Sequence, residues 1–170
     1  MISVNLEKTH NKKNFKCGKD SLDNYIKLNA KKDVVSNLAA CFVITQDNDV
    51  IGYYTLSCSS EDIEEVPDEM KKGIKGNYDN VPIILIGRLA IDKNYQGMGL
   101  GKVLFTDCLK RVLETSIIIG AFAVCVDPID DDAKEFYQKF GFIPLNDSNR
   151  MILPIKTLKK SFEQLKKGAS

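Results

Sequence analysis

The sequence predicts an α/β (α+β) fold in which helices flank a mixed central sheet. Residues 40–45 and 50–58 are apolar segments of strand length separated by a short polar turn, a pattern typical of an antiparallel hairpin. Residues 81–92 and 120–127 are apolar segments of the kind found in buried strands. Between them, residues 100–113 repeat apolar side chains at helical spacing. This alternation of strands and helices predicts a mixed sheet with helices packed on it.

Turn and capping residues divide the chain into elements in a definite order. The polar turn of the hairpin is Asp47-Asn48-Asp49, whose residue types favour tight turns. An aspartate in the run 130–132 is expected to cap a short helix. The predicted elements, in chain order, are a helix that opens at Asp20, strands over 40–45 and 50–58, a polar connection over 61–76, a strand over 81–92, a helix from about Leu100, a strand over 120–127, a helix over 130–140, a strand over 150–155 and a terminal amphipathic helix marked by Leu158, Phe162 and Leu165.

The length and composition are those of one globular domain. A chain of 170 residues can bury a core without a disulfide or a metal. It has no internal repeat and no Pro/Gly/Ser-rich linker, so residues 1–170 are expected to form a single domain. Lys and Arg number 24 against 23 Asp and Glu, and the net charge of +1 argues against a protein that coats nucleic acid by bulk electrostatics.

No segment of the sequence is suited to a membrane. The longest apolar run, residues 117–126, is ten residues long, whereas a bilayer-spanning helix needs about 20. The amino-terminal residues carry lysines without the apolar core of a secretory signal. The sequence therefore predicts a cytoplasmic protein with no membrane partner.

The cysteines do not form a metal-binding pattern. The chain has five cysteines, no C-x-x-C pair and a single histidine, His10, so no metal site is predicted. Four cysteines lie in apolar segments, where a free thiol packs as a small hydrophobic side chain; they are Cys41, Cys58, Cys108 and Cys125. Since His10 lies near the amino end, no histidine is available to activate a thiol, and an acyl-cysteine intermediate is not expected.

A glycine cluster stands between a strand that ends near Asp92 and a helix that starts near Leu100. It reads Gln96-Gly97-Met98-Gly99-Leu100-Gly101. Unpaired amide groups at a helix start bind phosphate, and glycine lets the backbone approach it closely. A nucleotide P-loop is excluded, because Gly101-Lys102 is followed by Val103 and no glycine stands five residues earlier. The dinucleotide fingerprint is excluded by the G-x-G-x-G spacing.

These residues resemble a known family. Residues 88–92 (RLAID) followed by 96–101 (QGMGLG) are similar to the acetyl-CoA motif of GNAT N-acetyltransferases, Q/R-x-x-G-x-G/A. Ala133 and residues 136–142 (FYQKFGF) are similar to the second motif of that family, A-x-x-x-Y-x-x-x-G-F. The resemblance implies a mostly antiparallel central sheet flanked by helices, and transfer of acetyl from acetyl-CoA as co-substrate to a primary amine.

Further residues resemble one branch of the superfamily, the toxin acetyltransferases of bacterial toxin–antitoxin pairs. The similarity lies in residues 15–18 (FKCG), 22–23 (LD), 52–54 (GYY) and 87–92 (GRLAID). The resemblance implies acetylation of the α-amino group of aminoacyl-tRNA, which blocks translation, and a ribbon-helix-helix antitoxin as partner. A homodimer is common in the family.

The resemblance also implies roles for individual residues. Main-chain groups of residues 89–91 would pair with the pantetheine arm like an added strand, and backbone amides of residues 96–102 would hold the pyrophosphate. The coenzyme-binding residues implied in this way are Leu89, Ala90, Ile91, Gln96, Gly97, Met98, Gly99, Leu100, Gly101, Lys102, Ala133 and Phe136. An N–H near Leu89 would stabilise the oxyanion, and Tyr137 would protonate the leaving thiolate. The alternative for Tyr137 is a core aromatic beside Phe136 and Phe140.

The sequence offers no obvious general base, and this bears on the substrate. A lysine amine with a pKa of about 10.4 is almost fully protonated at neutral pH, whereas an α-amino group with a pKa of about 7.7–8.0 is already partly neutral. A low-pKa amine such as that of aminoacyl-tRNA tolerates a missing base. Glu61, Asp62 or Asp127 acting through a water molecule are the alternatives.

The charge distribution is compatible with RNA binding. Residues 1–35 contain eight lysines and four acidic residues, and residues 156–170 contain five lysines and one acidic residue. These ends can form a basic face for RNA, or they can be solvated helix surfaces. Arg88, inside an apolar strand, is expected either to contact a substrate phosphate or to pair with a carboxylate.

Two other classes of function fit the same motifs. A GNAT enzyme can act on a small-molecule amine or a protein amino terminus instead of tRNA. A non-catalytic module can bind acyl-CoA and serve mainly to contact a protein partner.

Overall fold

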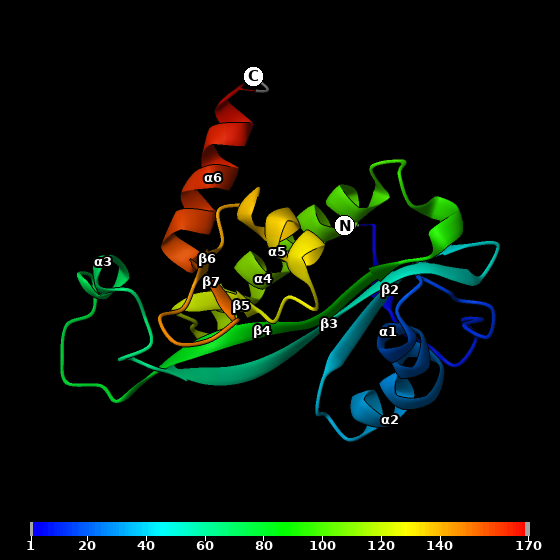
Figure 1. The fold of residues 1–170 in the computed structure, drawn as a ribbon, viewed down its shortest axis with the longest axis horizontal. Coiled ribbons are helices and arrows are strands. Elements are labelled where there is room, and N and C mark those ends of the chain that lie inside the picture. Colours follow the sequence, from blue (N-terminus) through cyan, green and yellow to red (C-terminus); the bar gives the residue numbers. More distant parts are fainter. Residues whose placement is uncertain (1, 169–170) are drawn as a thin grey trace. The chain divides into compact units, whose positions relative to one another are not determined.

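The computed structural model describes residues 2–168, which form a seven-stranded sheet with helices. The strand order is β1-β2-β3-β4-β5-β7-β6. Figure 1 labels every strand except β1. The pairs β1–β2, β2–β3, β5–β7 and β6–β7 are antiparallel. The predicted fold class is therefore confirmed. The strands are β1 (Val4–Asn5), β2 (Ala40–Gln46), β3 (Asp49–Asp62), β4 (Asn80–Ile91), β5 (Ala123–Val126), β6 (Ile143–Pro144) and β7 (Met151–Pro154).

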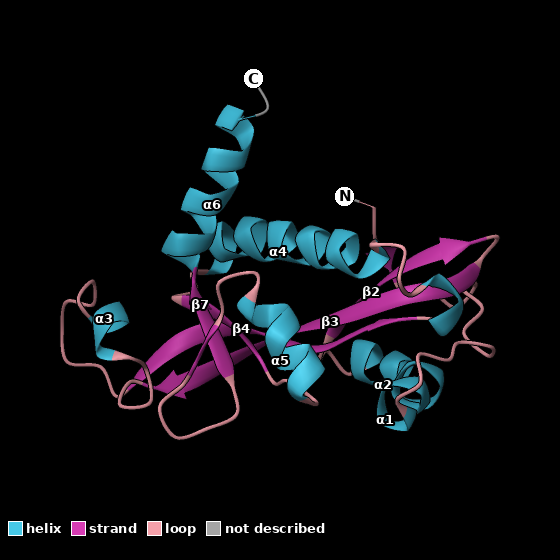
Figure 2. Ribbon diagram, turned by 45° about the horizontal axis from the view of Figure 1, so that its top comes forward, coloured by secondary structure: helices cyan, strands magenta, loops and turns pink. Residues whose placement is uncertain are grey.

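The helices follow the predicted order. They are α1 (Asp20–Asn24), the π-helix η1 (Tyr25–Asn29), α2 (Ala30–Val35), α3 (Asp68–Lys71), the 3-10 helix η2 (Lys93–Tyr95), α4 (Leu100–Ile119), α5 (Asp131–Gln138) and α6 (Ile155–Gly168). Figure 2 shows α3 within the connection between β3 and β4, and α6 following directly after β7. No helix among the described residues is long and apolar enough to cross a bilayer.

Two compact units divide the chain. The first contains residues 1–57 and 86–111, and the second contains residues 58–85 and 112–170. Each unit includes part of β3, of β4 and of α4.

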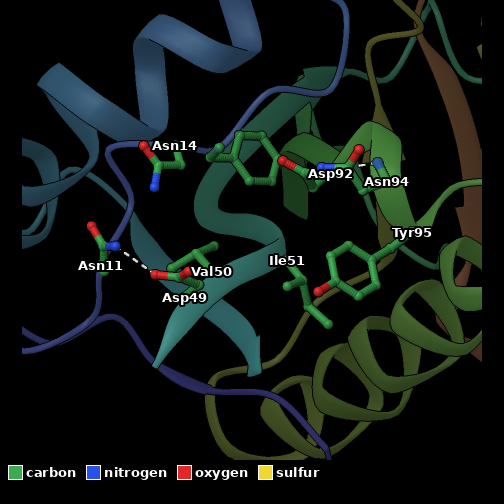
Figure 3. A pocket seen from close by; sticks show the side chains of 9 residues that line it. Asn11, Asn14, Asp49, Val50, Ile51, Asp92, Asn94 and Tyr95 are labelled. Carbon is green, nitrogen blue, oxygen red and sulfur yellow. Dashed lines mark hydrogen bonds between the residues drawn. The ribbon is translucent and has the colours of Figure 1, made fainter. Parts of the chain in front are cut away.

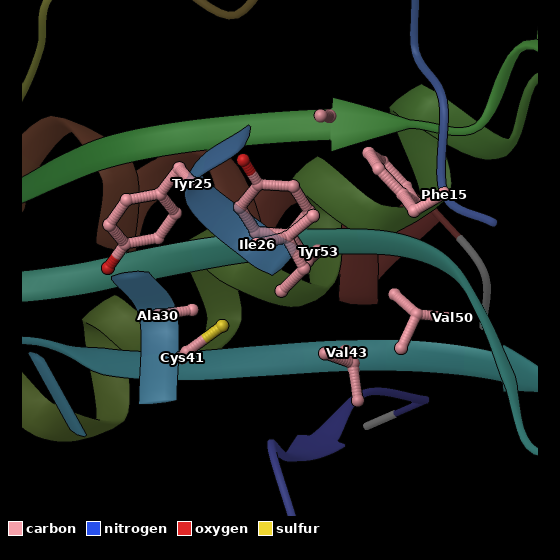
Figure 4. Packing of buried hydrophobic residues seen from close by; sticks show 9 residues of the cluster. Phe15, Tyr25, Ile26, Ala30, Cys41, Val43, Val50 and Tyr53 are labelled. Carbon is pink, nitrogen blue, oxygen red and sulfur yellow. The ribbon is translucent and has the colours of Figure 1, made fainter. Parts of the chain in front are cut away.

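The first unit is built around the β2–β3 hairpin. Asp47 and Asn48 have φ of 49° and 73°, so both turn residues are left-handed, as the tightest hairpin turns require. The continuous segment α1–η1–α2 packs on this hairpin through a buried cluster that includes Tyr25, Ile26 and Tyr53 (Figure 4). Leu28, which the apolar pattern placed with the core, is 62% exposed because it lies on the outer face of the π-helical turn.

The second unit has a core of its own. Residues of β4, β5 and β7 form a buried cluster, and Val66 and Leu145 join it from the connecting loops. The connection after β3 was expected to be merely polar, yet Val66 is completely buried and α3 follows it. The backbone of Asn146 donates to the Glu65 carbonyl at 3.1 Å, so this connection is fixed against the β6–β7 loop.

Candidate active site

The loop before α4 holds two glycines in the left-handed region of backbone space. Gly97 has φ 77° and Gly99 has φ 80°. A Cβ atom at either position would meet no atom within 4 Å. Glycine is therefore required by the backbone conformation and not by a shortage of space. The turn that they form leads from the end of β4 into α4.

This turn leaves the first amide groups of α4 without helical acceptors. The N–H groups of Lys102 and Val103 both donate to the Gly99 carbonyl, at 3.1 and 3.2 Å, so helical bonding begins there. The N–H groups of residues 97–101 precede that point, and the positive end of the helix dipole lies beside them. The arrangement is suited to bind a phosphate group.

The glycine turn is braced by the amino-terminal segment of the first unit. The buried carboxylate of Asp92 accepts hydrogen bonds from the backbone N–H of Asn94 at 2.9 Å and of Lys16 at 2.8 Å. The side-chain amide of Gln96 donates to the carbonyls of Cys17 at 2.9 Å and Ile91 at 2.8 Å. The Gln96 side chain thus fixes the protein loop, and the role of its backbone N–H in holding the pyrophosphate stays a prediction.

A small polar cavity lies beside this brace (Figure 3). Its volume is about 120 Å³, and its lining includes Asn11, Asp49, Asn94 and Tyr95. Small-molecule sites usually enclose roughly 300–1,000 Å³. The cavity is therefore too small for a coenzyme, and the glycine turn next to it is the better candidate for that role.

The edge of β4 offers a second feature for a coenzyme. β5 has four residues and β4 has twelve, so β5 is too short to pair with all of β4. The N–H of Phe122, just before β5, donates to the Pro82 carbonyl near the start of β4 at 2.8 Å. The end of β4 that contains residues 89–91 therefore extends past its neighbour, and an extended arm of a ligand can pair with it.

Most of the remaining predicted coenzyme residues lie along the same stretch of the first unit, but Ala133 and Phe136 lie on α5 (Asp131–Gln138) in the second unit, where both are half-buried. Ala90 and Ile91 are buried in β4, while Leu89 and Leu100 are half-buried. Met98 and Lys102 are exposed in the turn and the first turn of α4.

Tyr137 lies on α5 in the second unit. Asp130 caps this helix, as expected, because its carboxylate accepts from the N–H of Ala133 at 2.9 Å. Tyr137 is 7% exposed. Its ring contacts Phe136 at a centroid distance of 5.5 Å and Phe142 at 5.9 Å. The aromatic packing offered as an alternative is present with Phe136, while Phe142 takes the place expected for Phe140.

The turn after α5 explains the spacing of the second motif. Gly141 has φ 87°, and the N–H groups of Phe140 and Phe142 both donate to the Tyr137 carbonyl, at 3.0 and 3.3 Å. This left-handed turn returns Phe142 onto the Tyr137 ring. A glycine four residues after the tyrosine, followed by an aromatic residue, is what such a turn needs.

Residues 37–144 match the family model of the acetyltransferase (GNAT) domain. That range contains the glycine turn, the end of β4 and Tyr137. The chain belongs to the GNAT acetyltransferase family. The predictions of a GNAT fold and of N-acetyltransferase activity are confirmed.

The relatives of this GNAT chain include bacterial toxins. A tRNA-acetylating toxin of Mycobacterium tuberculosis is 35% identical over 128 residues, which are 75% of each chain. A probable toxin, TacT, of Sinorhizobium fredii is 31% identical over 160 residues, which are 88% of each chain. The solved structure of AtaT complexed with acetyl-methionyl-tRNAfMet has a TM-score of 0.85 at 27% identity, and covers 94% of this chain and 98% of that one. The predicted resemblance to the toxin branch is confirmed.

The cysteines of the GNAT chain differ in one respect from expectation. Cys41, Cys108 and Cys125 are buried, but Cys58 is exposed. The prediction for Cys58 was wrong because β3 continues past the packed part of the sheet to Asp62. Among residues 2–168, no group of three His, Cys, Asp or Glu side chains is arranged to hold a metal ion.

These cysteines should differ in their rates of alkylation. Burial raises the pKa of Cys41 to about 12 and that of Cys125 to about 12, and burial together with Asp23 raises the pKa of Cys17 to about 11. These thiols stay protonated at pH 8, and only the thiolate reacts. Iodoacetamide at that pH should therefore label Cys58 first, as read by peptide mass spectrometry. In urea all five should react, and prompt labelling of Cys17 in the folded protein would contradict the expectation.

Two of the three carboxylates considered as a base are held by one arginine. Arg150 donates to Asp127 through Nε and Nη2, at 2.6 and 2.8 Å, and through Nη1 to Glu61. The hydrogen bonds to Asp127 and Glu61 raise the pKa of Arg150 above its usual range. Asp62 is exposed and accepts from the N–H of Glu64 at 2.9 Å. The pairing with Arg150 gives Glu61 and Asp127 a structural role that the sequence did not indicate.

Removing Arg150 should destabilise the protein more than its surface position suggests. The Glu61 side chain is only 11% exposed, so Arg150→Gln leaves a mostly buried charge without its cation. We expect the free energy of unfolding to fall by about 1–3 kcal/mol, measured by urea denaturation. Lys71→Gln, which removes the pair with the exposed carboxylate of Asp68, should cost less than about 0.5 kcal/mol because Asp68 stays solvated. Equal losses in the two variants would contradict this account.

Proposed function

We propose that this GNAT acetyltransferase transfers the acetyl group of acetyl-CoA to the α-amino group of aminoacyl-tRNA, by direct attack in a ternary complex. The observation that carries the proposal is the similarity to a tRNA-acetylating toxin over three quarters of both chains. The complex of AtaT with acetyl-methionyl-tRNAfMet supports the same acceptor.

In the proposed complex, the diphosphate and the pantetheine arm of acetyl-CoA lie along residues 89–101 of the first unit. A solved structure of AtaTR with bound acetyl-CoA, 27% identical with a TM-score of 0.81, supports acetyl-CoA as the donor. We propose that the amides of residues 97–101 bind its diphosphate and that the free end of β4 pairs with its pantetheine arm. The left-handed glycines Gly97 and Gly99 and the short β5 favour this assignment.

The transfer reaction requires two groups of the protein, one to stabilise the oxyanion and one to donate a proton. The neutral amine nitrogen attacks the thioester carbon, the carbon–sulfur bond breaks, the thiolate takes a proton, and the attacking nitrogen releases one to solvent. We propose that an N–H near Leu89 stabilises the oxyanion and that Tyr137 supplies that proton. A solved structure of KacT, which is 30% identical, carries a tyrosine-to-phenylalanine substitution. A substitution that removes only a tyrosine hydroxyl is consistent with a role for such a hydroxyl in KacT. The α-ammonium loses its own proton to solvent, because its pKa is already near neutrality.

The partners and organisation follow from the same relatives. The GNAT match at residues 37–144 includes residues of both units, which supports one catalytic domain over residues 1–170. AtaT has been solved bound to the C-terminus of the antitoxin AtaR, and the AtaT–AtaR complex bound to DNA. We propose an antitoxin of the DNA-binding ribbon-helix-helix type for this chain, a homodimeric enzyme, and action in the cytoplasm, where charged tRNA is found.

Incubation with labelled acetyl-CoA and total charged tRNA tests the proposed function. The label should enter the tRNA fraction and leave it as N-acetylamino acid after mild alkaline deacylation. Uncharged tRNA should take up no label. Release of coenzyme A against free amines, with no label in tRNA, would overturn the choice of acceptor while keeping the acetyltransferase.

A further inference from the structure

Arg88 is the single charged residue of β4, and an aromatic ring, not a carboxylate, holds its side chain. Its guanidinium carbon lies 3.6 Å from the centroid of the Tyr25 ring. The side chain is half-buried, and no carboxylate within residues 2–168 forms an ion pair with it. Stacking uses the face of a guanidinium and leaves the N–H donors on its edge for another acceptor. Among residues 2–168, Arg88 is therefore held by stacking and not by a carboxylate.

The ring under Arg88 is itself fixed. The Tyr25 hydroxyl donates to the Asp33 carboxylate at 2.9 Å, and the ring stacks on Tyr53 at a centroid distance of 6.2 Å (Figure 4). Burial, and then the hydrogen bond to Asp33, raise the pKa of Tyr25 above its usual range. The phenol therefore stays neutral and does not offset the charge of Arg88. A fixed ring means that the guanidinium is held in one orientation before any ligand arrives.

Two lysines add positive charge at the same place. Lys12 and Arg88 both act electrostatically on the thiol of Cys41, and Lys31 repels Lys12. Burial, with this repulsion, lowers the pKa of Lys12. Neither lysine forms an ion pair within the part of the chain that the structure describes. Lys12 and Arg88 therefore lie close to the same thiol, and Lys31 on α2 adds positive charge beside Lys12, which is an arrangement that an anion would stabilise.

We propose that Arg88, with Lys12 and Lys31, binds a phosphate group of the tRNA substrate, at the acceptor end. A planar guanidinium fork binds phosphate through two parallel hydrogen bonds. Arg88 adjoins Leu89, where the proposed function places the reacting thioester, so the phosphate nearest the aminoacyl ester is the one within reach. The coenzyme also carries phosphates, but the amides of residues 97–101 already provide for its diphosphate.

This assignment rests on the proposed function and gives it a source of specificity. A small-molecule amine has no phosphate at the corresponding place and would gain nothing from the three cations. Arg88 is then a residue that selects the acceptor, and its loss should affect RNA binding without affecting the transfer step.

Binding and kinetics of Arg88→Gln and Arg88→Lys test the proposal. Arg88→Gln should raise the KM for aminoacyl-tRNA roughly tenfold and lower the salt slope of RNA binding by about 1. Arg88→Lys should keep the salt slope of the unmodified protein but still raise the KM for aminoacyl-tRNA, by less than Arg88→Gln does. Lysine keeps the positive charge but lacks the planar guanidinium that binds phosphate through two hydrogen bonds. The KM for acetyl-CoA and the turnover of an amino acid methyl ester should not change. Lys110→Gln, an exposed lysine of α4, is the matched control.

Anisotropy with a fluorescent acceptor-stem RNA measures binding without any chemistry, so it separates two failures. If the unmodified protein binds this RNA but acetylates no charged tRNA, the proposed function fails while the Arg88 site is still measured. If Arg88→Gln changes neither the salt slope nor any KM, the phosphate site is overturned. If it raises only the KM for acetyl-CoA, the phosphate belongs to the coenzyme and the RNA assignment is wrong. Tyr25→Leu should reproduce Arg88→Gln, with thermal melting used to show that the variant is folded.

Discussion

Tyr137→Phe is expected to lower the kcat of acetyl transfer by roughly 10²–10⁴-fold, which is the usual contribution of a positioned proton donor. The substitution removes one hydroxyl and keeps the ring that packs against Phe136 and Phe142. The melting temperature and the KM for acetyl-CoA should therefore be nearly unchanged. Steady-state transfer to charged tRNA measures the effect, and relief of growth arrest on induced expression provides a cellular readout.

The matched control for Tyr137→Phe is Tyr78→Phe, which removes the hydroxyl of an exposed tyrosine in the β3–β4 connection. It should keep full activity. If Tyr137→Phe also keeps its kcat, the tyrosine serves only in aromatic packing, and the proton must come from another group or from water.

Gly99→Val is expected to abolish coenzyme binding at concentrations where the unmodified protein is saturated. A β-branched residue at φ 80° costs about 1–2 kcal/mol in backbone strain, and relief of that strain would move the amides of the turn. We expect the Kd for acetyl-CoA, measured by calorimetry, to rise at least tenfold.

Gly120→Val separates this effect from general destabilisation. Gly120 follows α4, has φ 69°, and a Cβ there would also meet no atom within 4 Å. It imposes a similar strain away from the glycine turn, so it should lower the melting temperature and leave the Kd unchanged. A normal Kd in Gly99→Val would remove the glycine turn from the coenzyme site.

Local patterns in the sequence were sufficient for most of the fold. The hairpin turn at 47–49, the start of a helix at Asp20 and the Asp130 cap each depend on residues close in sequence, and all three are present. β1 and β6 have two residues each, and so short a strand leaves no period to detect. The start of α4 is marked in the sequence by glycines, but its end is not. The last turn of α4 carries exposed isoleucines, so residues 117–126 resemble one long apolar segment.

The site was predictable where a motif is local and not where contacts span the chain. The glycine turn and the Tyr137–Gly141 spacing could be recognised because each lies within a few residues. The bonds from Lys16 to Asp92 and from Arg150 to Glu61 join residues 76 and 89 positions apart. No periodicity or spacing reveals such partners. The stacking of Arg88 on Tyr25 is of the same kind, because these residues are 63 positions apart and no local pattern joins them.

The hydrogen bonds of residues 16–17 to Asp92 and Gln96 limit how far the protein can be truncated at its amino end. The family match begins at residue 37, which suggests a minimal fragment that starts there. Such a fragment would lack the backbone N–H that Asp92 accepts and the carbonyl that Gln96 binds. The catalytic machinery therefore depends on a stretch of chain that lies outside the match, and deletions from the amino end should impair the enzyme before they reach the sheet.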